Sequence, residues 1–184
     1  MAMLKRRKQG RTNYAKRLKM VASGAYRLVA RRSLKNIMLQ IIEYKKDGDI
    51  ILAASHSREL KKYGWPYSNK NTSAAYLLGL LIAVKAKKSG LKECIFDFGL
   101  ENAMHGGVLF AALKGAVDGG LKIPHDSVAL PKEDRINGEH IAKYARELSK
   151  EKYSKIFSNY IKANARPEEI KNKFDDAKKK ILSG

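Results

Sequence analysis

The chain has 184 residues, enough for one ordinary domain with extensions, and carries 38 lysines and arginines against 18 acidic residues. The formal net charge of +20 indicates a polyanionic partner, because a compact chain with this excess repels itself until the charge is neutralised. A hydrophobic content of 44% is enough to form a core and excludes a wholly disordered chain. The single cysteine, Cys94, excludes an internal disulfide, and we expect a small buried residue there, in a reducing cytosol.

The positive charge is concentrated at the N-terminus. Residues 1–42 contain 12 basic residues and no acid, whereas residues 43–140 contain 14 basic and 12 acidic residues. Residues 141–184 are again basic, with 12 lysines and arginines against 6 acids. A basic arm on a balanced core is typical of proteins that insert into or wrap around nucleic acid.

The first 24 residues are expected to form a basic arm and a short helix. Residues 1–11 lack apolar periodicity, and we expect them to order only on binding. Thr12 or Asn13 would cap a helix that runs to about Ser23 and ends at Gly24. The apolar face of this helix should dock on the core while its basic residues face outward; that face carries Tyr14, Leu18 and Val21.

Three strands are predicted next, over residues 26–31, 36–44 and 50–55. The second is apolar on both faces, as a central strand should be. Period two places Arg27 and Arg31 on the same side of the first strand. Asp47-Gly48 between the second and third strands is a strong hairpin signal, so an antiparallel meander is expected.

The remaining chain alternates between helices and one strand. We predict a mostly buried helix over 73–89 that is capped by Thr72, a strand over 93–98 and a helix over 107–118. Helices follow over 139–148, 149–164 and 167–182. Their apolar stripes should pack on the core or on a partner, and comprise Ile156, Tyr160 and Ile161 and, further on, Ile170, Phe174 and Ile181.

This order of elements predicts an α/β fold of the ribonuclease-H type. It would have a mixed sheet of five-strand type with helices on both faces. We divide the chain into the arm and short helix (1–24), the α/β core (25–130) and a C-terminal helical extension (131–184).

The segment 56–72, expected to be a loop, mixes aromatic residues with lysines. It contains the only tryptophan, Trp65, with Tyr63 and Tyr67 near it and Lys61, Lys62 and Lys70 on either side. Aromatic rings next to lysines can stack unpaired bases and hold phosphates. The same aromatic residues could instead pin the loop onto the core, and the sequence leaves both alternatives open.

Four segments in order resemble one known family. They are RTNYAKRLKMVASGAYRLVARRS (11–33), DGDIILAASHSRELKKYGW (47–65), LFAALKGAVDGGLKIPHDS (109–127) and GEHIAKY (138–144). They are similar to the archaeal form of the ribosomal protein L-eighteen family, whose eukaryotic member is called L-five. The resemblance implies a ribonuclease-H-like fold without catalysis, cofactor or metal. It also implies binding to 5S rRNA in the central protuberance of the large ribosomal subunit, in the cytoplasm.

The resemblance further implies contacts with large-subunit rRNA and neighbouring ribosomal proteins, and no DNA, membrane or homo-oligomeric partner. Family members bind RNA through the basic N-terminal segment and the strand-end loops. Together with the loop 56–72, this gives the candidate RNA-binding residues Lys5, Arg6, Arg7, Arg11, Asn13, Tyr14, Arg17, Lys19, Arg27, Arg31, Arg32, Lys35, Lys61, Lys62, Trp65 and Lys70. The chain departs from the family at MHGGVLF, where a small-residue and arginine pattern is expected, which leaves an RNA contact at 104–108 open.

Three other classes of protein would each require a further feature in the sequence. A metal-dependent nuclease on this fold would use Asp97 with Glu43 and Asp118, but such chemistry needs several acids converging on two metals. A DNA-binding protein would show a helix-turn-helix, zinc-finger or heptad pattern. A peripheral membrane protein would need a broader apolar helix than residues 13–23 provide.

Overall fold

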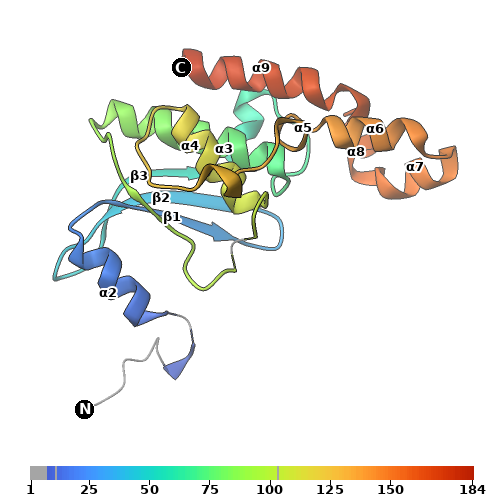
Figure 1. The fold of residues 1–184 in the computed structure, drawn as a ribbon. Coiled ribbons are helices and arrows are strands. Elements are labelled where there is room, and N and C mark those ends of the chain that lie inside the picture. The colour runs from blue at the N-terminus through green and yellow to red at the C-terminus, as the bar shows by residue number, and fades with distance from the viewer. Residues whose placement is uncertain (1–7, 11, 103) are drawn as a thin grey trace.

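The computed structural model describes residues 8–10, 12–102 and 104–184. At its centre lies a mixed sheet in the order β3-β2-β1-β4 (Figure 1). The strands are β1 (Arg27–Arg32), β2 (Ile37–Glu43), β3 (Ile50–His56) and β4 (Ile95–Asp97). The first three strands form the predicted antiparallel meander, and β4 joins β1 in parallel after a helical crossover.

The two faces of the sheet differ in chemistry. Leu28 and Ala30 of β1, with Leu39 and Ile41 of β2, are fully buried on the face that carries the helical core. Their alternate neighbours turn to the other face, so Arg27 and Arg31 lie on one side of β1, as the period of two predicts.

The expectation of a five-strand sheet is not confirmed, because the described residues form four strands. In the fifth position, beside β4, a single parallel bridge joins Glu93 to Lys122. The N–H of Lys122 donates to the carbonyl of Lys92, and the N–H of Cys94 donates to the carbonyl of Lys122. Pro124 follows two residues later and has no N–H to donate, which explains why the pairing does not extend.

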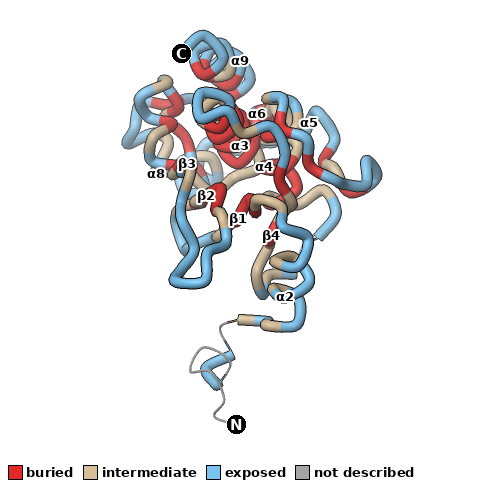
Figure 2. Tube along the Cα trace, turned by 90° about the vertical axis from the view of Figure 1, so that its left-hand side faces the viewer, coloured by how far each residue is buried: buried red, intermediate tan, exposed pale blue. Residues whose placement is uncertain are grey.

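Helices cover the apolar face of the sheet in two layers. The helices α3 (Thr72–Lys88) and α4 (Val108–Asp118) lie against the sheet, and α9 (Ile170–Ser183) lies over α3 (Figures 1 and 2). The residues from Ser73 to Ala83 of α3 are all buried, as its apolar sequence predicts. Asn71 caps this helix, one residue before the predicted cap, because its side-chain oxygen accepts the N–H of Ala74 at 2.8 Å.

The C-terminal helices differ in part from the prediction. The helices α5 (Glu133–Ile136) and α6 (Glu139–Glu147) are followed by α7 (Lys150–Ile156) and α8 (Ser158–Lys162). The single helix expected over 149–164 is thus broken at Phe157, whose ring packs against Tyr153 and Tyr160. The predicted stripe at Ile156 and Ile161 is about half exposed (50% and 47%), whereas the stripe of α9 is buried in the core as expected; it comprises Ile170, Phe174 and Ile181.

Cys94 is buried beside the start of β4, as expected from its sequence context. Burial raises the pKa of its thiol to about 12, so the group stays protonated and unreactive at neutral pH. Within the described residues, no helix is long and apolar enough to cross a lipid bilayer.

The close approach of α3 to α4 depends on two glycines. A Cβ atom at Gly79 would overlap the carbonyl oxygen of Ala112, and one at Gly115 would overlap the carbonyl oxygen of Tyr76. The absence of side chains at these two positions therefore lets the two backbones meet.

Replacing Gly115 by alanine should lower the free energy of unfolding by about 1–3 kcal/mol, the usual effect of overpacking a core. Alanine normally stabilises a helix relative to glycine by roughly 1 kcal/mol, so the sign of the effect is diagnostic. Urea unfolding of Gly115→Ala, with Lys87→Ala on the exposed side of α3 as the control, measures it. A stabilised Gly115→Ala would mean that the two helices are further apart than described.

Candidate nucleic-acid interface

The short helix α2 (Tyr14–Ala22) begins and ends where its sequence predicts. The side-chain oxygen of Asn13 accepts the N–H of Lys16 at 3.0 Å, which satisfies one of the free donors at the helix start. Gly24 follows the helix with a φ of +69°, a conformation that glycine adopts without strain. Asn13, a candidate RNA ligand, therefore already uses its side-chain oxygen to cap α2.

The orientation of α2 differs in part from the prediction, because Tyr14 and Val21 are partly buried as expected but Leu18 is not. Leu18 is 69% exposed, and every residue of the helix keeps some exposure. Lys16 and Arg17 face the sheet instead, across a cavity of about 690 Å³ that Arg27, Val29 and Arg31 line from β1. The Nζ of Lys16 lies 5.3 Å from the centre of the Phe98 ring. Ionic and cation–π contacts thus help to dock this helix below the sheet (Figure 1).

A chain of arginines and carboxylates lines the cavity between α2 and the sheet. Nη2 of Arg17 lies 3.1 and 3.0 Å from the two carboxylate oxygens of Asp49, at the start of β3. Asp49 also accepts from Nη2 of Arg27 at 2.7 Å. The other terminal nitrogen of Arg27, Nη1, donates to Asp97 of β4 at 3.3 Å.

Arg31 extends this chain at the other end of β1. Its Nη1 donates to the backbone carbonyls of Ala30 at 2.7 Å and Asp97 at 3.1 Å, and its Nη2 lies 3.8 Å from the Asp97 carboxylate. The side chain of Arg31 nevertheless stays 42% exposed. Arg31 can therefore meet a ligand while it is held by the protein.

The assignment of Arg27 as a direct RNA ligand is wrong. Arg27 is only 3% exposed, and its guanidinium is enclosed between two carboxylates. A buried cation needs such partners because desolvation without them is very costly. The residue is an internal ion-pair partner that ties β1 to the β2–β3 connection and to β4.

The turn between β1 and β2 presents two candidate residues. Nε of Arg32 donates to Glu101 at 2.5 Å, and its side chain is 38% exposed. Lys35 is exposed in the turn itself. Both are accessible to a polyanion, although Arg32 must share its charge with Glu101.

The prediction that Trp65 binds RNA is also wrong, because its side chain belongs to the core. Its side chain is 1% exposed, its Nε1 donates to the carbonyl of Ser68 at 3.2 Å, and its ring meets that of Tyr67 edge-on at 5.1 Å. The hydroxyl of Tyr67 in turn donates to the carbonyl of Arg166 at 2.6 Å. Of the two alternatives for this segment, the ring of Trp65 therefore pins the chain onto the core.

The lysines of the same segment lie on a well-anchored turn. Residues Ser57–Tyr63 form a short helical segment, in which His56 and Glu59 cap each other's backbone. Burial alone would raise the pKa of Glu59, but hydrogen bonds from Lys85 and the His56 backbone outweigh it and hold that pKa below its usual range. Lys61 and Lys62 project from this turn into solvent, and Lys70 is partly buried further on.

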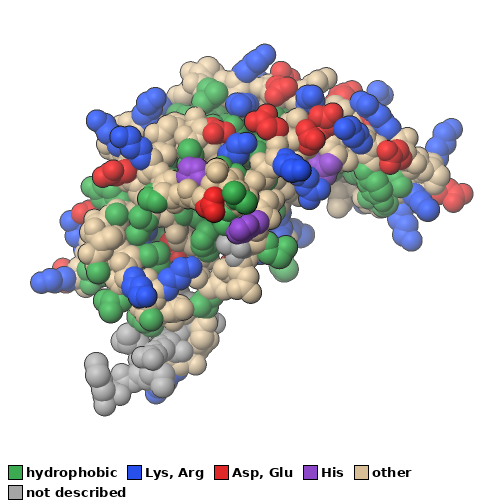
Figure 3. Space-filling view, in the orientation of Figure 1, with side chains coloured by type: hydrophobic (Ala, Val, Ile, Leu, Met, Phe, Trp, Pro, Cys, Tyr) green, Lys and Arg blue, Asp and Glu red, His purple; other side chains and the backbone are tan. Residues whose placement is uncertain are grey.

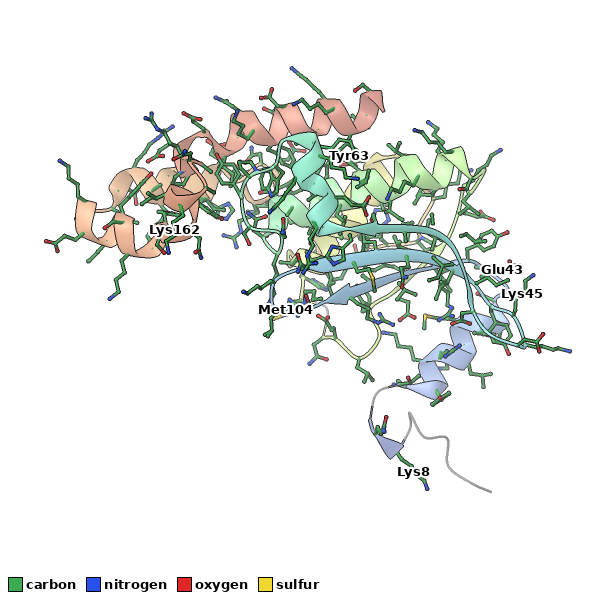
Figure 4. The ribbon with its side chains drawn as sticks, turned by 180° about the vertical axis from the view of Figure 1, so that it is seen from behind. Lys8, Glu43, Lys45, Tyr63, Met104 and Lys162 are labelled. Atoms are coloured by element: carbon green, nitrogen blue, oxygen red, sulfur yellow. The ribbon has the colours of Figure 1, made fainter. Side chains whose placement is uncertain are left out.

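The candidate residues thus fall on two sides of the sheet. Tyr63 lies on the side that carries α9, and Lys8 lies on the opposite side, beyond α2 (Figure 4). Tyr14, partly buried, and Lys19, exposed, belong to α2 on that second side. Figure 3 shows lysines and arginines near α2 and again over the C-terminal helices, where acids are interspersed. Lys5, Arg6, Arg7 and Arg11 lie outside the described residues.

The glycines at 106 and 107 use their backbone amides inside the protein. The N–H of Gly106 donates to the carbonyl of Ala129, and that of Gly107 donates to the carbonyl of Met104, both at 2.9 Å. These amides therefore form a tight turn before α4 and are not presented to a phosphate.

The three acids of the nuclease alternative do not converge. Asp97 is paired with Arg27, Glu43 with Lys45 at 2.7 Å, and Asp118 accepts the hydroxyl of Tyr76 at 2.7 Å on α3. A guanidinium thus occupies the position next to Asp97 where a nuclease would hold a metal ion. Among the residues described, no group of three histidine, cysteine or acidic side chains is placed to hold a metal.

The sequence reasoning missed the acids that organise this face, Asp49 and Glu101. Asp49 follows the predicted Asp47-Gly48 hairpin signal, and nothing in its spacing from Arg17 or Arg27 reveals the contact. The absence of acids before Glu43 was the available signal, because buried arginines in β1 must find carboxylates elsewhere in the chain.

The fold and this face define a basic α/β protein whose cations are partly engaged by its own carboxylates and partly exposed around α2, the β1–β2 turn and residues 61–62. The sequence matches the family described as "Ribosomal large subunit proteins 60S L5, and 50S L18" over residues 2–93 and 84–126. It is 48% identical over 182 residues to the "Large ribosomal subunit protein uL18" of Staphylothermus marinus, covering 97% of this chain and 90% of that protein. It is 47% identical over 181 residues to the protein of the same name from Thermofilum pendens, covering 97% and 92%.

The chain belongs to this family of large-subunit ribosomal proteins. Membership indicates a structural, non-enzymatic role in the ribosome, with ribosomal RNA and other ribosomal proteins as partners. The resemblance seen in the sequence is confirmed, including its archaeal character.

Replacing Trp65 by leucine should lower the free energy of unfolding by about 2–4 kcal/mol, since it leaves a cavity and breaks the contact with Tyr67. Below the unfolding transition, RNA affinity should stay within about twofold of the wild type, because the buried ring cannot stack on a base. Denaturant unfolding and filter binding measure the two effects. A large loss of affinity in folded Trp65→Leu would restore the stacking role.

Proposed function

We propose that this protein binds 5S rRNA and helps to attach it to large-subunit rRNA in the central protuberance of the cytoplasmic ribosome. The observation that carries the proposal is the acid-free segment 1–42, which leads through α2 onto the first strand. The four ordered segments that resemble the 5S-binding family support the choice of RNA.

Binding would combine charge with shape. Lysines and arginines of the arm neutralise phosphates and release counterions, which gives affinity with little sequence information. Lys19 on α2, with Arg32 and Lys35 at the β1–β2 turn, extends this cationic surface onto the folded part. An A-form duplex hides its major groove, so specificity should come from shape, 2′-hydroxyls and splayed loop bases.

The second group of cations faces away from α2. Lys61 and Lys62 are exposed on the segment 57–63 after β3, whose last residue, Tyr63, lies on the side of α9 (Figure 4). Two cationic regions on opposite sides suit a protein that lies between two pieces of RNA. We assign the α2 side to 5S rRNA and the residue 61–62 side to large-subunit rRNA or a neighbouring protein.

The test is binding of the purified protein to 5S rRNA, tRNA and duplex DNA across a salt series. We expect 5S rRNA to bind more tightly than the other two by about a hundredfold or more at moderate salt. Replacing Lys5, Arg6, Arg7 and Arg11 by glutamine should flatten the slope of log affinity against log salt by about 3. Equal binding of all three nucleic acids would contradict the 5S assignment.

A matched control removes the same charge elsewhere. Glutamine replaces four exposed lysines of α9: Lys171, Lys173, Lys179 and Lys180. This variant should keep the salt slope of 5S binding close to that of the wild type, because α9 lies on the far side of the sheet from α2 (Figure 1). If the salt slope becomes flatter by the same amount in both variants, the arm contributes only net charge.

A further inference from the structure

Asp49 holds together parts of the chain that are distant in sequence. It follows the β2–β3 turn, and its carboxylate receives Arg17 from α2 and Arg27 from β1. The Asp49 side chain is 24% exposed and that of Arg17 is 33% exposed, so this half of the contact lies at the edge of the cavity below the sheet. Arg27 is itself paired with Asp97, so Asp49 is connected through Arg27 to β4.

The helix α2 has no fully buried residue of its own. Its apolar residues hold it only in part, because Leu18 is 69% exposed and Tyr14, Met20 and Val21 are only partly buried. A cavity of about 690 Å³ separates part of the helix from β1. Lys16 adds a cation–π contact to the Phe98 ring. A helix of 9 residues is marginal by itself, so its order must come from such tertiary contacts.

We propose that Asp49 is a positioning residue for RNA binding, which fixes α2 and the basic arm before it in the orientation that meets RNA. The inference rests on the proposed function, since it concerns the same RNA-binding face. Preorganisation favours binding because the free protein has already lost the freedom that the complex would remove. An acidic residue thereby increases the affinity of the protein for a polyanion.

The direction in which RNA affinity changes when the Asp49 charge is removed distinguishes positioning from simple electrostatics. Asp49 carries a negative charge close to a face that should meet phosphates. If charge alone mattered, removing it would strengthen RNA binding, and it would also release Arg17 to a phosphate. Positioning predicts the opposite, because an unanchored α2 must be ordered when RNA binds.

The primary experiment compares Asp49→Asn with Asp47→Asn in the full-length protein, by binding to 5S rRNA and to tRNA. Asp47 is exposed in the same turn, so the two variants change the net charge equally and within two residues of each other. We expect Asp49→Asn to weaken binding by about tenfold, and Asp47→Asn to leave it unchanged or strengthen it slightly. Equal or tighter binding by Asp49→Asn overturns the proposal.

A double-variant cycle tests whether the effect passes through Arg17. We expect Asp49→Asn to weaken binding far less in an Arg17→Gln background than in the wild type, because the pair is already broken there. Hydrogen exchange of the free protein adds a readout independent of RNA. Amides of residues 14–22 should exchange faster in Asp49→Asn while those of α3 stay protected. Additive effects of the two substitutions, or unchanged exchange in α2, would contradict the inference.

Arg17→Lys keeps the experiment decisive if Asp49→Asn does not fold. Lysine retains the charge but is shorter and replaces the planar guanidinium by a flexible ammonium group, and the buried Arg27–Asp49 pair stays intact. It should speed exchange in α2 and weaken binding at an unchanged salt slope; unchanged exchange would sink the idea. Selectivity of the wild type for 5S rRNA tests the proposed function, whereas the ratio of the two asparagine variants, on any RNA that binds, tests Asp49.

Discussion

The structure depends on one buried cation. The guanidinium of Arg27 lies between the carboxylates of Asp49 and Asp97, with 4% of its side chain exposed. A charge in that position needs its carboxylate partners, because breaking a buried ion pair by removing one partner costs about 3–5 kcal/mol. Through this requirement β1, β4 and the β2–β3 connection are fixed to one another. The same carboxylate of Asp49 then carries α2, so the placement of the N-terminal helix follows from the pairing inside the sheet.

This arrangement divides the positive charge of the chain into two classes. Arg17 and Arg27 are held by carboxylates, and Arg32 shares its charge with Glu101. Lys19 and Lys35 are exposed beside them. The number of basic residues in the first 42 positions therefore overstates how many can meet phosphates, since part of that charge organises the face that presents the rest. Few acids are needed for this, because each of Asp49 and Asp97 serves more than one arginine.

The aromatic residues after β3 join the sheet to the C-terminal helices. Trp65 meets Tyr67 edge-on, and Tyr67 meets Tyr160 in the same manner at 5.2 Å. The hydroxyl of Tyr67 reaches the backbone of Arg166, so the segment before α9 is hydrogen-bonded to the turn before α3. With α9 packed on α3, these contacts explain why an aromatic, lysine-rich segment that suggested base stacking serves mainly to connect two parts of the fold.

The sequence by itself determined the features that depend on near neighbours. The cap at Asn13, the antiparallel meander and the buried helix before β4 all follow from residues a few positions apart, and they appear where they were predicted to within about two residues. The ordered segments also determined the family. Only the tertiary structure decided which arginines are free, because the partners of Arg27 lie 22 and 70 residues away along the chain. It likewise decided that Trp65 is buried and that the sheet ends at β4, since packing density and edge pairing depend on segments that meet only in the folded protein.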